Sequence, residues 1–302
     1  MGTPDFAVPS LKILVEQGYD IAAVITAPDK RAGRGHKLRQ SPVKQYALSQ
    51  DLRLLQPPKL KDPEFLAELR ALNANLQVVV AFRMLPRVVW DMPEIGTFNL
   101  HASLLPQYRG AAPINWAIIN GERKTGLTTF FLKQKVDTGD LIAQVEEPIH
   151  PEDNAGTLHD RLAKKGATLV LETVRKIEAD DYRLSPQSKT ETPLRKAPKI
   201  FTETCQIDFD QPTQRVHDFV RGLSPYPAAR MRLLDKNCKV FATEPLPPEA
   251  HPETAIKPGE YLSDNESYLH FRTADGFLAI TSLQLAGKRR MAITDFLRGN
   301  EV

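Results

Sequence analysis

Apolar residues in the first 180 positions follow two alternating patterns. Helical spacing places the apolar side chains of 8–17 on one face, and the same spacing recurs over 62–72 and 157–179. Between these segments lie apolar runs without polar alternation, typical of strands buried on both faces. Such runs occupy residues 21–26, 76–82, 97–101, 127–132 and 141–145, with a short helix expected over 113–120. The alternation predicts an α/β domain with a doubly wound, mainly parallel sheet.

The pattern changes after Asp181. Residues 182–200 are rich in Ser, Pro, Gln, Thr and Lys, which is typical of a linker. Beyond them, strands are predicted at 201–209, 230–234, 238–243, 268–272 and 277–285, one helix over 214–221, and turns at Asp235-Lys236-Asn237 and Asp275-Gly276. These short strands predict a small OB-like β-barrel. We therefore expect an α/β domain over 1–181, a linker over 182–200 and a barrel over 201–302.

The chain starts without the strand that normally opens a doubly wound domain. Met1-Gly2-Thr3-Pro4 already resembles the loop that follows such a strand. In a parallel sheet this strand would be central, and each of its large buried side chains would contribute about 2–5 kcal/mol, against a total stability of about 5–15 kcal/mol. We therefore expect that Met1 is an internal methionine of a longer protein.

Composition excludes several classes of protein. The 302 residues are 41% hydrophobic and 25% charged, as in ordinary globular proteins, and a net charge of +3 does not by itself indicate nucleic acid. No apolar run approaches the length of a membrane span, and the first residues do not form a secretory signal. The two cysteines, Cys205 and Cys238, lie in no metal-binding cluster. We expect a cytoplasmic protein without a metal, a disulfide framework or a membrane partner.

Asn99 and His101 stand two positions apart at the end of an apolar run, so their side chains point to the same face of a strand. Ligands of open α/β sheets bind beside the carboxyl ends of strands, where this pair falls. A lone histidine on a strand is also compatible with a structural, hydrogen-bonded role. The position favours a ligand-binding or catalytic site, but these two residues alone do not indicate which reaction it performs.

Asp137-Thr138-Gly139-Asp140 is a polar loop between two apolar runs. Asp and Gly are turn formers, so the loop by itself is compatible with an ordinary turn. Together with Asn99 and His101, however, it offers an amide donor, an imidazole that exchanges a proton near neutral pH, and a carboxylate that can hold the imidazolium form. Asn99, His101 and Asp137 are therefore the candidate catalytic residues.

Longer strings around these residues resemble a known family. They are Asn99-Leu100-His101-Ala102-Ser103-Leu104-Leu105-Pro106, Arg109-Gly110-Ala111-Ala112-Pro113, Asp137-Thr138-Gly139-Asp140, Gly2-Thr3-Pro4-Asp5-Phe6 and Ala32-Gly33-Arg34-Gly35. In this combination the chain resembles the folate-dependent formyltransferases over essentially its whole length. The resemblance implies a Rossmann-like catalytic domain over 1–181 and a tRNA-binding barrel over 201–302.

The resemblance also implies a reaction that supports translation initiation. 10-Formyltetrahydrofolate, as co-substrate, would donate its formyl group to the free α-amino group of methionine on initiator methionyl-tRNA. Asn99 and His101 would stabilise the oxyanion, at about 2.7–4 kcal/mol for each donor, and Asp137 would orient His101 and relay a proton. No metal is required, and we expect a monomer.

By the same resemblance, the folate site would be lined by Ser103, Leu104, Leu105 and Pro106, beside the strand end at 81–86. There the chain departs from the common family pattern, in which Ala-Tyr-Gly precedes Ile-Leu-Pro. This chain has Ala81-Phe82-Arg83-Met84-Leu85-Pro86, one residue shorter and with Arg in place of Gly. The fold should follow the family there, whereas the pterin contacts should differ.

Positive charge gathers in two places. The loop over 27–44 carries Lys30, Arg31, Arg34, Lys37, Arg39 and Lys44 against the single acid Asp29, and a second cluster is Lys288-Arg289-Arg290. Each is compatible with a solvated surface or with phosphate binding. The resemblance implies that the first loop contacts the tRNA acceptor stem, chiefly through Arg34 with Lys30, Lys37 and Arg39, although Arg31 replaces a proline common in this motif. Lys288 and Arg289 would support binding from the barrel.

Three alternatives remain open at this level. Related enzymes formylate glycinamide ribonucleotide or nucleotide-linked amino sugars, but they lack this pairing of basic loop and barrel. A formyltetrahydrofolate hydrolase would use water as acceptor and would not need the Arg34 loop. The third alternative is an inactive RNA-binding remnant, suggested by the missing first strand.

Overall fold

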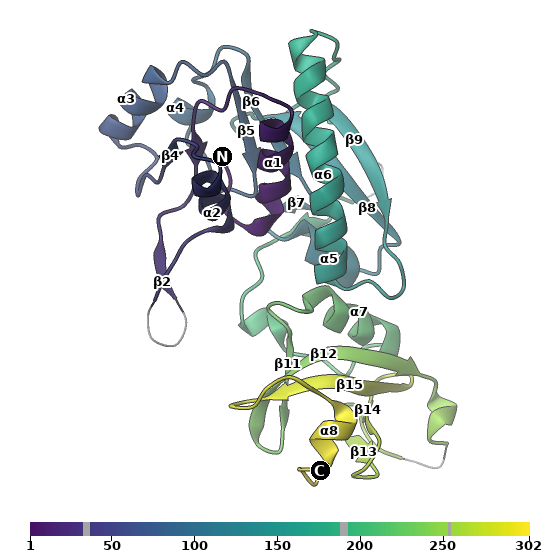
Figure 1. Ribbon diagram of the computed structural model, residues 1–302. Helices are drawn as coiled ribbons and strands as arrows, with labels where there is room; N and C mark the ends of the chain where they lie inside the picture. Colours follow the sequence, from purple (N-terminus) through teal and green to yellow (C-terminus); the bar gives the residue numbers. More distant parts are fainter. Residues whose placement is uncertain (33–36, 188–192, 253–254) are drawn as a thin grey trace. The chain divides into compact units, whose positions relative to one another are not determined.

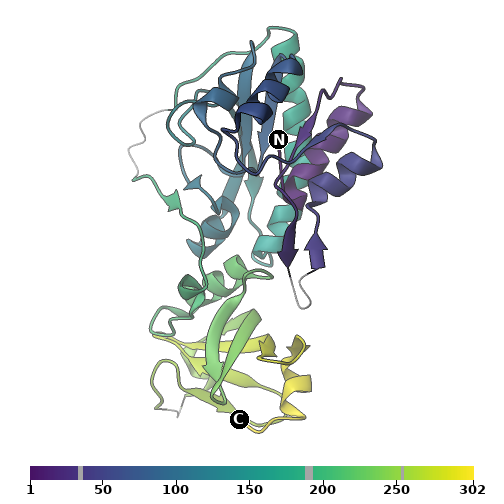
Figure 2. The ribbon, with the colours of Figure 1, turned by 90° about the vertical axis from the view of Figure 1, so that its left-hand side faces the viewer.

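The computed structural model describes residues 1–32, 37–187, 193–252 and 255–302, which form two compact units (Figures 1 and 2). The first unit comprises Met1–Arg109, Gly126–Glu147 and His159–Arg195. The second comprises Gly110–Thr125, Pro148–Leu158 and Lys196–Val302. Each unit is therefore discontinuous in sequence, and the segment up to Arg195 belongs to the first.

The first unit is built around a four-stranded sheet. Its strand order is β5 (Leu76–Val80), β6 (Gly96–His101), β8 (Lys124–Phe131) and β9 (Leu141–Pro148). β5 is parallel to β6, but β6 is antiparallel to β8, with His101 opposite Thr128. The connection over 102–123 begins and ends at the same end of the sheet, so β8 must return antiparallel. A separate parallel pair joins β1 (Val24–Ile25) to β4 (Leu54–Leu55). The predicted α/β class is confirmed.

Two helices predicted from apolar spacing lie side by side in this unit, α1 (Val8–Glu16) and α6 (Ala155–Glu178) (Figure 1). Their carboxyl ends are joined by a hydrogen bond from Arg175 to Gln17, 2.6 Å long. α6 also contacts the sheet, because the hydroxyls of Thr129 and Thr173 lie 2.9 Å apart. At Gly166 an added Cβ would lie 2.8 Å from the Leu100 side chain, so this glycine lets α6 approach β6 closely.

Two further helices of the unit, α2 (Pro42–Ser49) and α3 (Pro63–Ala71), begin at prolines and have side-chain caps. The short α4 (Arg87–Trp90) and η1 (Asp5–Ala7) each follow a proline and have no side-chain cap. Asp62 accepts a hydrogen bond from the Glu64 amide at 3.0 Å, and Ser41 accepts one from the Lys44 amide at 3.0 Å. Apolar spacing predicts α3 but not α2, although Ser41-Pro42 is a typical helix start.

The backbone of Met1 and Gly2 connects the β1–β4 pair to the four-stranded sheet. The Gly2 amide donates to the Ile25 carbonyl at 3.0 Å, and the Val80 amide donates to the Met1 carbonyl at 2.9 Å. A Cβ at Gly2 would lie 2.6 Å from that of Ala7, so no side chain fits there. Beside this junction lies a cavity of about 570 Å³, lined by residues of α1, β1 and β5.

The second unit is built on an antiparallel sheet. Its strand order is β11 (Ala229–Leu233), β12 (Lys236–Leu246), β15 (Phe277–Leu285), β14 (Leu269–Arg272) and β13 (Tyr261–Ser263), with β16 (Met291–Ala292) paired to β15. The unit also contains α5 (Pro113–Ile119), α7 (Thr213–Leu223), α8 (Ile293–Leu297), η3 (Pro248–Ala250) and β10 (Lys196–Ala197), which pairs with β7 (Arg109–Gly110). The predicted C-terminal β domain is confirmed, and β15 has the predicted bounds.

One predicted strand, over 201–209, is wrong. Its centre is the 3-10 turn η2 (Glu203–Cys205), and only an isolated bridge joins Gln206 to Arg230. The Phe201 amide donates to the Thr204 hydroxyl at 3.1 Å, and that hydroxyl donates back to the Phe201 carbonyl at 2.8 Å. These local side-chain bonds occupy backbone groups that a strand would need, and apolar content does not reveal them.

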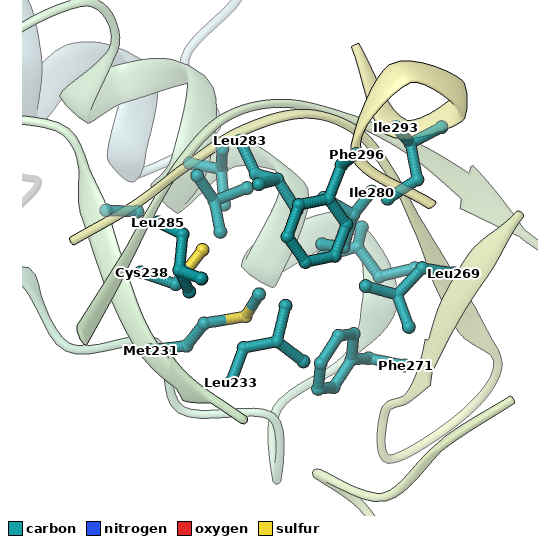
Figure 3. Close-up of a cluster of buried hydrophobic side chains, with 14 of the residues drawn as sticks. Met231, Leu233, Cys238, Leu269, Phe271, Ile280, Leu283, Leu285, Ile293 and Phe296 are labelled. Atoms are coloured by element: carbon teal, nitrogen blue, oxygen red, sulfur yellow. The ribbon is translucent and has the colours of Figure 1, made fainter. Parts of the chain in front are cut away.

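An apolar core lies within the second unit (Figure 3). It contains Met231, Leu233, Cys238, Leu269, Phe271, Ile280, Leu283, Leu285, Ile293 and Phe296. Burial raises the pKa of the Cys238 thiol to about 11, and burial likewise raises that of Cys205. Both cysteines are free and buried, so they act as small core residues rather than as reactive thiols.

A side chain from a distant turn caps α7. Asp275, in the turn between β14 and β15, accepts hydrogen bonds from the amide and from the hydroxyl of Thr213, each 2.7 Å long. The helix has no cap of its own, because its N-cap residue is Pro212. The predicted Asp275-Gly276 turn thus also fixes the start of a helix 62 residues away in sequence.

We expect Asp275→Ala to lower the free energy of unfolding by about 1 kcal/mol, the usual cost of losing a helix cap. Urea denaturation measures the change. Asp275→Asn keeps an acceptor oxygen and should retain most of the stability; equal losses in both variants would contradict this role.

Candidate active site

Asn99 and His101 lie at the carboxyl end of β6. They are two positions apart, so their side chains point to the same face of the sheet, and their pairing partners on β8 are Phe130 and Thr128. Asn99 is half-buried and His101 is buried. β6 is paired on both sides, which holds both residues on a rigid element.

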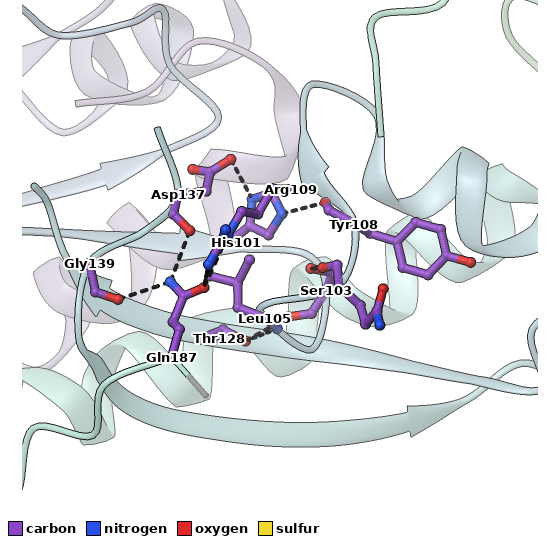
Figure 4. A network of polar contacts seen from close by, with 10 residues as sticks. His101, Ser103, Leu105, Tyr108, Arg109, Thr128, Asp137, Gly139 and Gln187 are labelled. Atoms are coloured by element: carbon purple, nitrogen blue, oxygen red, sulfur yellow. Dashed lines mark hydrogen bonds and ion pairs between the residues drawn. The ribbon is translucent and has the colours of Figure 1, made fainter. Parts of the chain in front are cut away.

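The two ring nitrogens of His101 face different oxygen atoms (Figure 4). Nε2 lies 3.0 Å from the Tyr108 carbonyl, and because a carbonyl only accepts, Nε2 must carry a proton. Nδ1 lies 4.0 Å from Oδ2 of Asp137, within ion-pair range but beyond hydrogen-bond length. The two side chains are only 7% and 12% exposed, so little water screens this pair.

Asp137 projects from the loop between β8 and β9. Its φ of +52° lies in the left-handed region, which few residues other than glycine adopt. Gly139 in the same loop tolerates no side chain, since an added Cβ would lie 1.6 Å from the Phe131 carbonyl oxygen. The Asp140 carbonyl accepts from the Phe131 amide at 3.1 Å. The structure thus brings Asp137 to His101 by a tightly packed turn.

Further polar contacts, which the sequence does not predict, surround the pair of His101 and Asp137. Arg109 donates from Nε and Nη2 to the Gln187 side-chain oxygen, with the Nε contact 3.1 Å long. Gln187 donates in turn to the carbonyls of Asp137 at 2.8 Å and Gly139 at 2.9 Å (Figure 4). In the sequence, Arg109 stands out only as part of a motif, and Gln187 falls in the predicted linker. The composition of a segment does not predict hydrogen bonds to residues that are distant in the sequence.

The loop over 103–106, expected to contact folate, is strongly tethered. The Ser103 hydroxyl donates to the Gln107 carbonyl at 2.7 Å, and the Thr128 hydroxyl donates to the Ser103 carbonyl at 2.6 Å. Gln144 donates to the Leu105 carbonyl at 2.9 Å. Ser103 and Leu105 are buried, whereas Leu104 and Pro106 are half-buried.

The strand end that departs from the family pattern has contacts of its own. Arg83 donates to the carbonyls of Pro57 and Pro58, the latter at 3.0 Å, and its guanidinium lies 5.6 Å from the centre of the Phe82 ring. Met84 is 77% exposed. The arginine thus ties this turn to the neighbouring 57–58 segment.

The first basic cluster is carried by a hairpin of β2 (Lys30–Ala32) and β3 (Lys37–Arg39). Lys30 is paired directly with Arg39, and both are exposed. The backbone of Lys37 lies in β3, and Arg34 lies outside the described residues. Lys44 differs from the hairpin cations, because it donates to Asp29 at 2.7 Å and Gln56 at 2.9 Å and so belongs to the scaffold.

The second basic cluster lies on the turn between β15 and β16. Lys288 and Arg289 are exposed. Arg290 instead packs over the Phe241 ring, 4.5 Å from its centre, and donates to the Ser282 hydroxyl at 2.9 Å. Within the described ranges, no group of acidic, His or Cys side chains could hold a metal ion, and no helix is long and apolar enough to cross a membrane.

Comparison with protein families matches both parts of the chain. The profile described as "Formyl transferase" covers residues 1–174, and "Formyl transferase, C-terminal domain" covers 199–301. A methionyl-tRNA formyltransferase of Bacteroides fragilis is 55% identical over 306 residues, 99% of this chain and 93% of that protein. One of Parabacteroides distasonis is 56% identical over 99% and 94%.

Solved structures share the fold at lower identity. WlaRD, a sugar 3N-formyl transferase determined in the presence of dTDP and 5-N-formyl-THF, has a TM-score of 0.67 at 19% identity, covering 95% of this chain and 97% of that one. HypX from Aquifex aeolicus, in complex with tetrahydrofolic acid, has a TM-score of 0.59 at 23% identity, covering 83% and 43%.

We expect Gly139→Ala to lower the free energy of unfolding by about 1–3 kcal/mol, because the Phe131 carbonyl must move to admit the methyl group. Chemical denaturation measures this loss. Gly299→Ala, at a position where an added Cβ meets nothing within 4 Å, is the matched control and should be close to neutral. Equal stability of the two variants would refute the tight packing of the loop.

Proposed function

Because the chain belongs to the formyl transferase family, we infer that it catalyses the formylation of methionyl-tRNA. The observation that carries this function is full-length similarity, at 55–56% identity, to proteins named for that activity. The candidate site fits the chemistry, since a buried histidine and carboxylate face each other at the end of a central strand.

We propose 10-formyltetrahydrofolate as the donor and the free α-amino group of methionine on initiator tRNA as the acceptor. Support for a folate donor comes from relatives of the same fold, one determined with tetrahydrofolic acid and another with 5-N-formyl-THF. The reaction needs no resident metal. We place it in the cytoplasm, in support of translation initiation, and expect a monomer.

In the proposed mechanism the neutral amine attacks the formyl carbon, and the formyl oxygen becomes an oxyanion. Collapse of this intermediate breaks the bond between the carbon and the folate nitrogen, while a proton passes from the attacking amine to that nitrogen. Asn99 supplies an amide donor to the oxyanion. Since Nε2 of His101 is bonded to the Tyr108 carbonyl, Nδ1, which lies 4.0 Å from the Asp137 carboxylate, is the ring nitrogen left to donate to the oxyanion.

Asp137 has two roles in this proposal. Its carboxylate lies 4.0 Å from Nδ1 of His101, so it stabilises positive charge on the ring as the oxyanion forms. It also relays the amine proton through water toward the departing folate nitrogen. Both roles depend on the shielding of the pair from bulk solvent.

We propose that Ser103, Leu104, Leu105 and Pro106 line the folate site, with different roles for its buried and its half-buried residues. Ser103 and Leu105 are buried and tethered by Thr128 and Gln144, so they shape the loop. Leu104 and Pro106 keep exposed surface and are the members of this set that offer apolar contact to the pterin ring.

For tRNA we propose Arg34, Lys30, Lys37 and Arg39, with Lys288 and Arg289 on the C-terminal unit. Lys30 and Arg39 stand directly opposite each other on the hairpin, an arrangement of like charges that costs stability. A bound phosphate backbone would remove this repulsion. We propose that residues 1–181 form the catalytic part, 182–200 the connection and 201–302 the tRNA-binding part.

The test of function is transfer of labelled formyl from 10-formyltetrahydrofolate to charged initiator tRNA. We expect Asn99→Ala and His101→Ala each to lower kcat by about 10²–10³-fold, the usual cost of losing an oxyanion donor. His159→Ala, at a histidine on α6, is the matched control and should keep its activity. Unchanged turnover in both site variants would refute the mechanism, and formylation of dTDP-linked amino sugars alone would refute the acceptor.

Binding of uncharged initiator tRNA should weaken steeply with salt. We expect Lys30→Ala and Arg39→Ala each to lower affinity and to reduce the slope of log affinity against log salt by about 1 for each phosphate that is no longer neutralised. Fluorescence anisotropy across a salt series measures this slope, with exposed Lys176→Ala as the control. An affinity that does not change with salt would exclude the electrostatic interface.

A further inference from the structure

The candidate catalytic pair is part of a closed ring of contacts. His101 donates to the Tyr108 carbonyl, and the neighbouring Arg109 donates to Gln187. Gln187 donates to the carbonyl of Asp137, whose carboxylate faces His101 again. The ring links three segments, the end of β6 with its following turn, the loop over 137–139, and residue 187 (Figure 4).

The loop that bears Asp137 needs an external support. The left-handed conformation of Asp137 is unfavourable for a residue with a side chain and persists only where surrounding contacts impose it. Val136, the preceding residue, is 55% exposed, so burial does not hold this side of the loop. The two bonds from Gln187 are to the carbonyls on either side of Thr138, and they fix the path of the backbone there.

Glutamine is chemically suited to this position. Arginine only donates and carbonyls only accept, so the Gln187 amide has one possible orientation, with its oxygen on Arg109 and its nitrogen on the loop. Both hydrogens of the nitrogen are used. Glutamate has the same shape but no donor, and would place carboxylate oxygens against two carbonyl oxygens.

Segments on either side of Gln187 are anchored to the same two places. Ser185 and Leu141 exchange backbone hydrogen bonds of 2.8 and 3.0 Å, just after the Asp137 loop. Arg195 accepts from the Tyr108 amide at 2.7 Å, and its own amide donates to the Gln107 side chain at 2.8 Å. Residues 182–187 therefore bond to the chain around the Asp137 loop, and residues 193–195 bond to the turn that follows β6.

We propose that Gln187 is a positioning residue for formyl transfer, acting with Arg109 to hold the Asp137 carboxylate at His101. Gln187 bonds to the backbone carbonyls of Asp137 and Gly139, so its effect is transmitted through the backbone of the 137–139 loop. This inference rests on the proposed function for its kinetic consequence, whereas its structural consequence is independent of the reaction.

The kinetic test uses the full chain with Gln187→Ala, Gln187→Glu and Asp137→Asn. We expect both Gln187 variants to lower kcat by about 10–100-fold, with KM for methionyl-tRNA changed by no more than about twofold. The double variant Gln187→Ala/Asp137→Asn should be no slower than Asp137→Asn alone, because both changes remove the same contribution. Gln50→Ala, at an exposed glutamine whose side chain bonds to the adjacent Ser49, is the matched control.

A structural test separates this inference from the proposed function. In Gln187→Ala, backbone amides over 138–140 should exchange with deuterium about tenfold faster than in the wild type or in Gln50→Ala, with the urea midpoint little changed. Unchanged exchange, or losses in the double variant that multiply, would overturn the positioning role. A wild-type protein that does not formylate methionyl-tRNA would refute the proposed function, while the exchange data would still decide whether Gln187 holds the loop.

Discussion

The pairing of β6 on both of its edges is the constraint on which the candidate site depends. β5 holds it from one side in parallel register and β8 from the other in antiparallel register. A slip of one residue would turn Asn99 and His101 to the opposite face of the sheet. Close approach of α6 at Gly166 packs β6 on one face as well, so the candidate residues stand on a strand that is held on both edges and on a face.

Around this rigid strand, the remaining geometry is imposed by hydrogen bonds rather than by apolar packing. Tyr108 and Asp137 both have left-handed backbone conformations, with φ of +58° and +52°. Each is costly in isolation, and each is held by a hydrogen bond with the chain after α6, Tyr108 with the Arg195 carbonyl and Asp137 with the Gln187 side chain. The chain after α6 therefore completes the candidate site in addition to connecting two domains.

Cations in this protein fall into two physical groups. Lys44, Arg109 and Arg290 are bonded to carboxylate, amide or hydroxyl oxygens or stacked on a ring, and they belong to the scaffold. Lys30, Arg39, Lys288 and Arg289 are exposed, and two of them are paired against each other on the hairpin. The second group contributes little to stability, which leaves its charge available to a polyanion.

The sequence alone determined the class of fold, the principal helices and the identity of the candidate catalytic residues, because periodic burial and motif spacing are local properties of the chain. Helix 8–17 appears as Val8–Glu16, and strand 277–285 as Phe277–Leu285. Only the tertiary structure establishes that 201–209 is not a strand, that Asp275 caps α7, and that Gln187 bonds to Asp137 across 50 residues and to Arg109 across 78. Such bonds form between segments that are far apart in the sequence. The spacing of apolar residues and the composition describe each segment alone, so they do not predict which segments come into contact.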